Sequence, residues 1–268
     1  KFIFALGGLG TVFSVKKNIN KLYKIILLPL LKLSFSGEKT RLILQNTDDI
    51  KLLLNKKIIS KEKITLIRGA GVDTKQFSPS KKNSFKKPVV LFASRLLWTK
   101  GVGDFIECAA RLKPKRNSKF VLVGKPDNLN PESVPEGQIN EWEKNKIIDW
   151  WGYQENMARI LQKSSIVCLP TVYGEGLPKI LIEAASCGLP IITYNVPGCR
   201  EIVKDKINGY LVPVNDIDNL EESLNYLIEN KNVCEKMGRR GREYVIKYFS
   251  QEQIADQTIK LWDMVLAG

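Results

Sequence analysis

The chain contains the apolar run Ser165-Ile-Val-Cys-Leu-Pro170 and, one residue later, the segment Val172-Tyr-Gly-Glu-Gly-Leu-Pro-Lys-Ile-Leu-Ile-Glu-Ala-Ala185. The first run is typical of a buried strand. In the second, two glycines surround Glu175, and Pro178 suits the first turn of a helix because its missing N–H is not needed there. The pattern predicts a strand, a glycine turn and a helix, in that order. The start of the helix would present free backbone N–H groups and the positive end of the helix dipole.

Such a helix start is suited to a phosphate or to the hydroxyls of a sugar. Glu183 follows Glu175 by eight residues, which corresponds to about 12 Å along a helix. The two carboxylates could then contact opposite ends of one ligand, a spacing that suits a nucleotide-sugar. Glutamate pairs at this spacing also occur by chance on solvated helices, so the interpretation needs further motifs.

Two more blocks supply them. Val89-Val-Leu-Phe-Ala-Ser-Arg-Leu-Leu-Trp-Thr-Lys-Gly-Val-Gly103 combines a predicted strand with Arg95, Lys100 and Gly101. Val196-Pro-Gly-Cys-Arg-Glu-Ile-Val203 is followed by Asn208-Gly-Tyr-Leu-Val-Pro213. In this order, the three blocks resemble the retaining GT-B glycosyltransferases with the Glu-x7-Glu signature. That large family includes bacterial enzymes that extend lipid-linked polysaccharide and oligosaccharide intermediates.

The resemblance implies an α/β fold of the GT-B type. Residues 81–245 are expected to form the complete C-terminal, Rossmann-like donor-binding domain with a parallel sheet. Residues 1–80 are expected to be a remnant of the N-terminal α/β acceptor-binding domain and a linker, and residues 246–268 a helix that packs back toward that domain. The polar run from Phe77 to Ser84 marks the predicted boundary. The front of the N-terminal domain, which supplies a donor-facing glycine loop and a histidine in many family members, has no recognisable counterpart here.

Periodicity predicts the individual elements. After Pro88, apolar runs alternate with helical patterns in the rhythm of a doubly wound parallel sheet. Strands are predicted over 88–93, 119–123, 147–151, 166–169 and 190–194, and helices over 102–113, 155–163, 178–187, 217–229, 231–247 and 251–266. The stretch 125–145 is predicted to be a long loop. Before the boundary, the patterns favour strands over 41–45 and 64–67, a helix after Asn46, and a helix over 22–35 with a kink at Pro29.

Gly7-Gly-Leu-Gly10 follows an apolar stretch at the start of the chain. It lacks the complete G-x-G-x-x-G pattern and the acidic residue about 20 positions later that dinucleotide binding requires. We therefore interpret it as a structural turn, with a loop on the acceptor side as the alternative.

Transfer of a sugar from a nucleoside diphosphate needs cations near the departing diphosphate, where negative charge grows. Arg95 offers a planar fork and Lys100 a mobile point charge, so both are candidate catalytic residues. The resemblance gives Glu175 contacts with sugar hydroxyls and an electrostatic role at the anomeric centre. It places Glu183 on the ribose hydroxyls and the backbone of Gly176, Leu177 and Pro178 on the donor sugar and phosphate.

Three further residues follow predicted strands, where ligands gather in an open α/β sheet. They are Gly124, Gly152 and Tyr153, which are candidates for the nucleobase pocket. The alternative is that these are turn glycines and a surface tyrosine.

Composition excludes several kinds of chemistry. The 268 residues include no histidine, which rules out Ser-His-Asp and Cys-His catalysis and histidine-ligated metals. The five cysteines form no CxxC motif and are interpreted as reduced packing residues. With no acidic DxD-like pair in a suitable loop, we expect a metal-independent enzyme whose nucleoside diphosphate sugar is a substrate.

The net charge of +14 is unevenly distributed. Residues 1–100 contain 21 Lys and Arg against 5 Asp and Glu, whereas residues 101–268 contain 21 against 23. A basic first third suits anionic lipid, the diphosphate of an acceptor or nucleic acid, although a solvated lysine-rich face is an equal alternative. The chain has no apolar run of about 18 residues, so no transmembrane helix is expected. We expect a cytoplasmic protein, peripheral at the inner face of the cytoplasmic membrane.

These observations favour a retaining glycosyltransferase that moves a sugar, with UDP as the preferred carrier, to a lipid-linked glycan. A truncated, non-catalytic sugar-nucleotide-binding module is the alternative. A third hypothesis, a basic nucleic-acid binder, rests on charge alone. Nucleic acid is not expected as a partner, because the chain has neither a recognised module nor an aromatic and basic platform.

Overall fold

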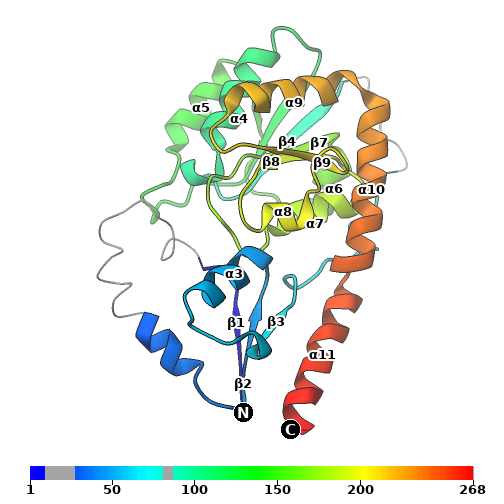
Figure 1. Cartoon of the computed structure of the whole chain (residues 1–268). Helices are drawn as coiled ribbons and strands as arrows, with labels where there is room; N and C mark the ends of the chain where they lie inside the picture. The colour runs from blue at the N-terminus through cyan, green and yellow to red at the C-terminus, as the bar shows by residue number, and fades with distance from the viewer. Residues whose placement is uncertain (10–27, 81–86, 268) are drawn as a thin grey trace.

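The computed structural model describes residues 1–9, 28–80 and 87–267. Its strands form a three-stranded and a six-stranded sheet, both parallel. Figure 1 shows the sheets in two separate parts of the molecule, with both ends of the chain beside the smaller sheet. The Lys1 ammonium donates to the carbonyl of Leu266 at 2.6 Å, which confirms that the ends meet.

The smaller sheet has the order β1-β2-β3. Its strands are β1 (Phe2–Leu6), β2 (Thr40–Leu44) and β3 (Ile64–Leu66), with α3 (Thr47–Asn55) and η1 (Lys61–Lys63) between the last two. Leu42, Leu44 and Leu53 are fully buried and form the centre of its core. The two predicted strands and the helix after Asn46 are therefore confirmed. Residues 28–34 are helical, whereas the rest of the helix predicted over 22–35 lies outside the described residues.

The larger sheet has the order β6-β5-β4-β7-β8-β9. Its strands are β4 (Val89–Ala93), β5 (Lys119–Val123), β6 (Asp149–Trp150), β7 (Ile166–Leu169), β8 (Ile191–Tyr194) and β9 (Gly209–Val212). The helices that accompany it are η2 (Trp98–Lys100), α4 (Val102–Leu112), α5 (Glu136–Lys144), α6 (Met157–Leu161), α7 (Lys179–Ser186), α8 (Cys199–Ile202) and α9 (Ile217–Glu229). The strand order reverses between β4 and β7, and an open parallel sheet binds its ligands at such a switch point, beyond the carboxyl ends of the strands.

The prediction for residues 125–145 was wrong in part. This stretch contains the helix α5, which buries Ile139 completely. Trp142 of α5 packs edge-on against Trp98, with ring centroids 6.1 Å apart. The prolines before α5 suggested a loop, but they end at Pro135, which is the N-cap, and the apolar residues after it are spaced for a helix. The predictions did not include β9 or α8, and the strand over 147–151 is only two residues long.

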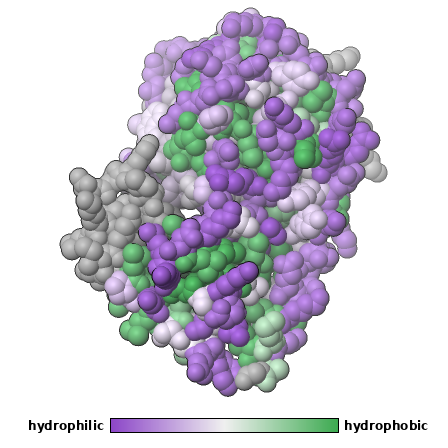
Figure 2. All heavy atoms as spheres, viewed as in Figure 1, coloured by the Kyte–Doolittle hydropathy of each residue, from purple (hydrophilic) through white to green (hydrophobic). Residues whose placement is uncertain are grey.

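Two long helices close the chain as predicted, α10 (Lys231–Phe249) and α11 (Gln251–Ala267). Ile254 and Leu261 of α11 are buried against Ile67, next to Ile3 and Ile43 of the smaller sheet. The last helix therefore runs along that sheet, as Figure 1 shows. Figure 2 shows apolar atoms exposed in the same part of the molecule, where Phe2 and Leu33 are 67% and 71% exposed.

Gly101 connects η2 to α4 in the left-handed conformation, with φ 80°. A Cβ at this position would lie 2.0 Å from the carbonyl oxygen of Pro170, which belongs to the loop after β7. Gly101→Ala is expected to destabilise the fold by about 2–4 kcal/mol through strain and the clash. Thermal unfolding measures the effect. The control is Gly137→Ala in α5, where no atom lies within 4 Å of the added methyl group. Equal stability of both variants would contradict this account of the turn.

Candidate active site

The loops after β4 and β7 lie at the switch point of the larger sheet and carry most of the predicted residues. The loop after β7 continues to Pro178, whose φ of −65° and ψ of 110° make it the N-cap of α7. Glu175 therefore lies in the loop and only Glu183 lies on the helix. The estimate of about 12 Å along one helix was wrong for this reason, because the helix begins four residues after Glu175.

Lys100 and Glu175 form an ion pair at this place. Lys100 Nζ is 2.5 Å from Glu175 Oε1, and their side chains are 13% and 22% exposed. Both line a hollow of about 200 Å³, together with Arg95, Gly176 and Leu177. The structure thus brings five of the predicted residues to one hollow. Pro178 does not line it.

Gly7 and Gly8 line the same hollow from the other sheet, a role that their interpretation as a turn did not assign. A Cβ on Gly8 would lie 2.6 Å from the backbone nitrogen of Gly176. A Cβ on Gly176 would lie 1.9 Å from the carbonyl oxygen of Gly7. The two glycine loops pack backbone against backbone, so neither position has space for a side chain. The available signal was the pair of adjacent glycines directly after a strand.

A second hollow of about 540 Å³ lies next to the first, and Arg95 lines both. Gly124, Tyr153 and Glu183 line the second hollow, as does Lys179. Gly152 is not among the lining residues, and its carbonyl accepts a hydrogen bond from the backbone N–H of Gly124 at 2.9 Å. Gly152 therefore supports the loop after β5 without lining the hollow.

The charged groups of this second hollow differ in their surroundings. Glu183 has an 8% exposed side chain, and burial raises its pKa, while Lys179 at 3.5 Å acts in the opposite direction. Arg95 is 64% exposed and pairs with Asp127 at 3.2 Å. A buried acceptor and an exposed guanidinium therefore lie on the walls of one hollow, an arrangement suited to a ligand with hydroxyls at one end and phosphates at the other.

Glu201, in the third sequence block, joins the two sheets. Its carboxylate accepts hydrogen bonds from the Thr47 backbone at 2.8 Å, the Thr47 hydroxyl at 2.7 Å and Arg68 Nε at 2.8 Å. Burial favours the neutral form of Glu201, but the hydrogen bonds from Thr47 and Arg68 outweigh it and lower the pKa. The start of α3 is thereby fixed against the larger sheet.

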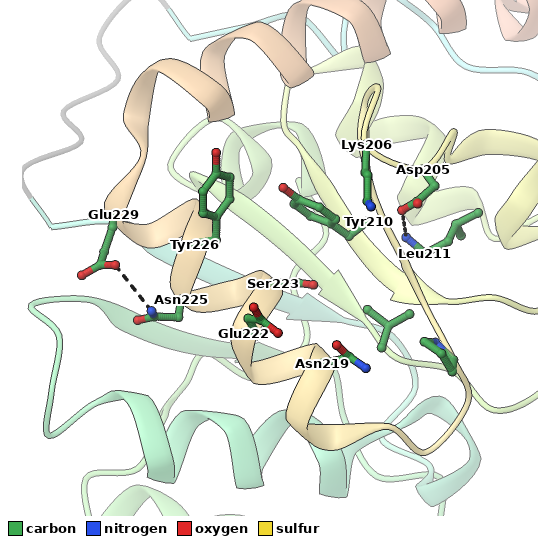
Figure 3. Close-up of a pocket in the computed structure, with 12 residues that line it drawn as sticks. Asp205, Lys206, Tyr210, Leu211, Asn219, Glu222, Ser223, Asn225, Tyr226 and Glu229 are labelled. Atoms are coloured by element: carbon green, nitrogen blue, oxygen red, sulfur yellow. Dashed lines mark hydrogen bonds between the residues drawn. The ribbon is translucent and has the colours of Figure 1, made fainter.

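A separate hollow of about 570 Å³ lies between β9 and α9 (Figure 3) and contains none of the predicted residues. Several polar groups on its walls serve the local fold. Asp205 accepts from the backbone N–H of Leu211 at 3.0 Å, and Glu229 pairs with Arg116 at 2.9 Å. The hollow is separate from the cleft lined by Arg95 and Glu183.

Other expectations concern the chain as a whole. All five cysteines are free and buried, as expected of packing residues. The described residues include no group of three or more Cys, Asp or Glu side chains arranged to hold a metal ion. Within the same residues, no helix is long and apolar enough to cross a membrane.

The sequence of residues 73–244 matches the family of glycosyl transferases group 1. The chain belongs to this family. The match covers both hollows of the larger sheet's switch point, apart from the contribution of Gly7 and Gly8.

Two relatives of this glycosyltransferase have names that state their reactions. One is the N,N'-diacetylbacillosaminyl-diphospho-undecaprenol alpha-1,3-N-acetylgalactosaminyltransferase of Campylobacter jejuni, 29% identical over 97% of this chain and 69% of that protein. The other is the UDP-Gal:alpha-D-GlcNAc-diphosphoundecaprenol alpha-1,3-galactosyltransferase of Escherichia coli, 28% identical over 85% of this chain and 61% of that protein. The chain thus spans about two thirds of the length of these relatives.

Solved structures confirm the expected α/β fold of the GT-B type. HepE of Anabaena in complex with UDP superimposes with a TM-score of 0.81 at 17% identity, over 98% of this chain and 72% of that one. Sucrose-phosphate synthase of Thermosynechococcus elongatus superimposes with a TM-score of 0.83 at 22% identity, over 99% of this chain and 68% of that one.

Proposed function

We propose that this chain contains the donor site of a retaining glycosyltransferase that transfers a sugar from a UDP-sugar to a lipid-linked glycan. The observation that carries the proposal is the position of Arg95 between two hollows. One hollow combines two cations with glycine backbone, and the other combines a buried carboxylate with an exposed tyrosine. A nucleoside diphosphate sugar has the matching order of groups, from base and ribose through diphosphate to sugar.

The nucleoside end belongs in the hollow of about 540 Å³ that Glu183 and Tyr153 line. Glu183 accepts hydrogen bonds from the ribose hydroxyls, and its raised pKa reflects burial that a bound ribose would offset with hydrogen bonds. Tyr153 is 65% exposed and offers a ring face to the base beside Gly124. Support for UDP comes from the E. coli relative, whose name includes UDP-Gal, and from the UDP complex of HepE.

The diphosphate and the sugar belong in the smaller hollow. Arg95 and Lys100 neutralise the charge that develops on the departing diphosphate, so the proposal requires no metal. Glu175 exchanges part of its contact with Lys100 for the sugar hydroxyls and for the positive charge that grows at the anomeric carbon. Electrostatic groups fixed in advance at such positions are usually the largest single contribution to catalysis.

The acceptor attacks from the face that the diphosphate leaves. Its hydroxyl oxygen forms a bond to the anomeric carbon while the bond from that carbon to the β-phosphate oxygen breaks. The hydroxyl proton passes to the departing phosphate oxygen, and the configuration is retained. Glu175 is not the nucleophile in this scheme, because the acceptor hydroxyl attacks the anomeric carbon directly.

The acceptor is proposed to be a glycan on a lipid diphosphate, since the names of two relatives contain diphospho-undecaprenol or diphosphoundecaprenol. The excess of Lys and Arg in residues 1–100 gives the first third of the chain the charge that an anionic membrane attracts. We propose a peripheral position at the inner face of the cytoplasmic membrane on this basis.

Proton NMR of the reaction product tests the reaction. The full-length gene product, given UDP-sugars and a lipid-diphosphate glycan, is expected to form an α-linked product from an α-linked donor. A product of inverted configuration would contradict the mechanism. Binding of UDP without any turnover would favour the non-catalytic sugar-nucleotide-binding module instead.

A further inference from the structure

Asn46 is a fully buried polar residue at the point where the two glycine loops meet. It follows β2 and is the N-cap of α3, with its Oδ1 accepting from the Asp49 backbone N–H at 2.7 Å. Its Nδ2 lies 3.3 Å from the carbonyl oxygen of Glu175 and 3.2 Å from that of Gly176. A residue in the loop after β2 therefore contacts the loop that carries the candidate catalytic carboxylate.

The amide has two hydrogens for three acceptors. One serves the Asp49 carboxylate at 2.9 Å, and the carbonyls of Glu175 and Gly176 share the other as a three-centre bond. The helix cap fixes the orientation of the amide, because the reverse orientation would place its NH₂ group against the Asp49 N–H. Asn46 consequently presents a donor, and not an acceptor, to the loop.

Asp49 extends this contact to the other glycine loop. Its carboxylate accepts from the backbone N–H of Leu9, directly after Gly8, and the residue is 8% exposed. Asn46 and Asp49 together thus hold both loops that line the smaller hollow. Glu201 keeps the start of α3 in place through its bonds to Thr47.

The carbonyl contacts determine the direction of two peptide groups. In a trans peptide, the N–H points away from the C=O. With the carbonyls of Glu175 and Gly176 on Asn46, the N–H groups of Gly176 and Leu177 point away from it. Both residues line the smaller hollow, and adjacent backbone N–H groups of this kind bind anionic oxygens.

We propose that Asn46 is a positioning residue that fixes the Gly176–Leu177 backbone for the second phosphate of the donor. The inference rests on the proposed function and adds to it a residue outside the three sequence blocks. Asn46 acts only through the loop, because its amide is occupied by Asp49 and by the two carbonyls.

The test is Asn46→Ser, which keeps an oxygen acceptor for the helix cap and removes the amide donor. Calorimetric titrations with UMP and UDP isolate the contribution of the second phosphate, which UMP lacks. We expect the affinity for UDP to fall about tenfold, the effect of losing about one net hydrogen bond, while the affinity for UMP is unchanged. A loss of stability without a positioning role would weaken the binding of both nucleotides together.

The matched control is Asp216→Ser, an exchange of the N-cap of α9, where Asp216 accepts from the Asn219 backbone. It is expected to leave both affinities unchanged. If the wild-type chain binds UDP and Asn46→Ser lowers both affinities equally or neither of them, the positioning role is wrong. If the wild-type chain binds neither nucleotide, the proposed function fails and this inference fails with it.

Discussion

Lys100→Ala is expected to lower the kcat of the full-length gene product about 100- to 1000-fold, the range seen when one fixed charge-stabilising group is removed. The substitution removes a cation beside the departing diphosphate. It also leaves Glu175 without the ion pair at 2.5 Å, so a carboxylate faces the growing negative charge of the leaving group. Steady-state kinetics with a UDP-sugar and a lipid-diphosphate glycan measure the loss.

The effect of the unpaired Glu175 carboxylate can be separated from the loss of the Lys100 cation. In the double variant Lys100→Ala/Glu175→Gln, the repulsion between Glu175 and the diphosphate is absent, so the combined loss should be smaller than the product of the single losses. The control is Lys119→Ala, which removes a lysine at the first residue of β5, at the opposite end of the strand from the cleft. Full activity of Lys100→Ala would show that Lys100 is not a catalytic residue.

Glu183→Gln is expected to weaken UDP binding about 10- to 100-fold. A carboxylate accepts stronger hydrogen bonds from ribose hydroxyls than a neutral amide does, and each such bond contributes about 1.5–3 kcal/mol. Calorimetry at neutral pH measures the change. The control is Glu222→Gln, since Glu222 lines the separate hollow between β9 and α9. An equal loss in both variants would contradict the place given to the nucleoside.

Glu183→Gln is also expected to change how the stability of the protein depends on pH. Burial raises the pKa of Glu183 above its usual value of 4.5, so the folded state binds this proton more tightly than the unfolded state. Stability is therefore lost as the pH rises from 4.5 through the raised pKa. Glu183→Gln should remove that loss and be at least as stable as the wild type at neutral pH. UDP affinity of the wild type should rise over the same pH range, because the ionised carboxylate is the acceptor.

The local parts of the site could be predicted from the sequence. Apolar runs followed by glycine and a helix signal placed Arg95 and Lys100 in the loop after one strand and Glu183 on the helix after another, because strand and helix periodicities differ over a few residues. The prediction places Glu175 in the glycine turn and begins the helix at Pro178, whereas Pro178 is the cap and the helix begins at Lys179. A shift of that size lies within the usual uncertainty of a helix boundary. Only the distance estimate counted all eight residues from Glu175 to Glu183 as helical.

Contacts between the two sheets could not be predicted in this way. Gly7 and Gly176 meet across 169 residues of sequence, and Asn46 reaches a carbonyl 130 residues away. No periodicity or cap signal relates positions so far apart. Asn46 was recognised as a helix cap, which is a local property, but its second contact depends on how the loop after β7 lies against the smaller sheet.

The structure of this chain with UDP bound tests the central claim most directly. In that structure we expect the base beside Gly124 and Tyr153, the ribose hydroxyls on Glu183, and the diphosphate between Arg95 and the Gly176–Leu177 backbone. UDP bound elsewhere, for example in the hollow between β9 and α9, with the cleft at Arg95 empty, would contradict it.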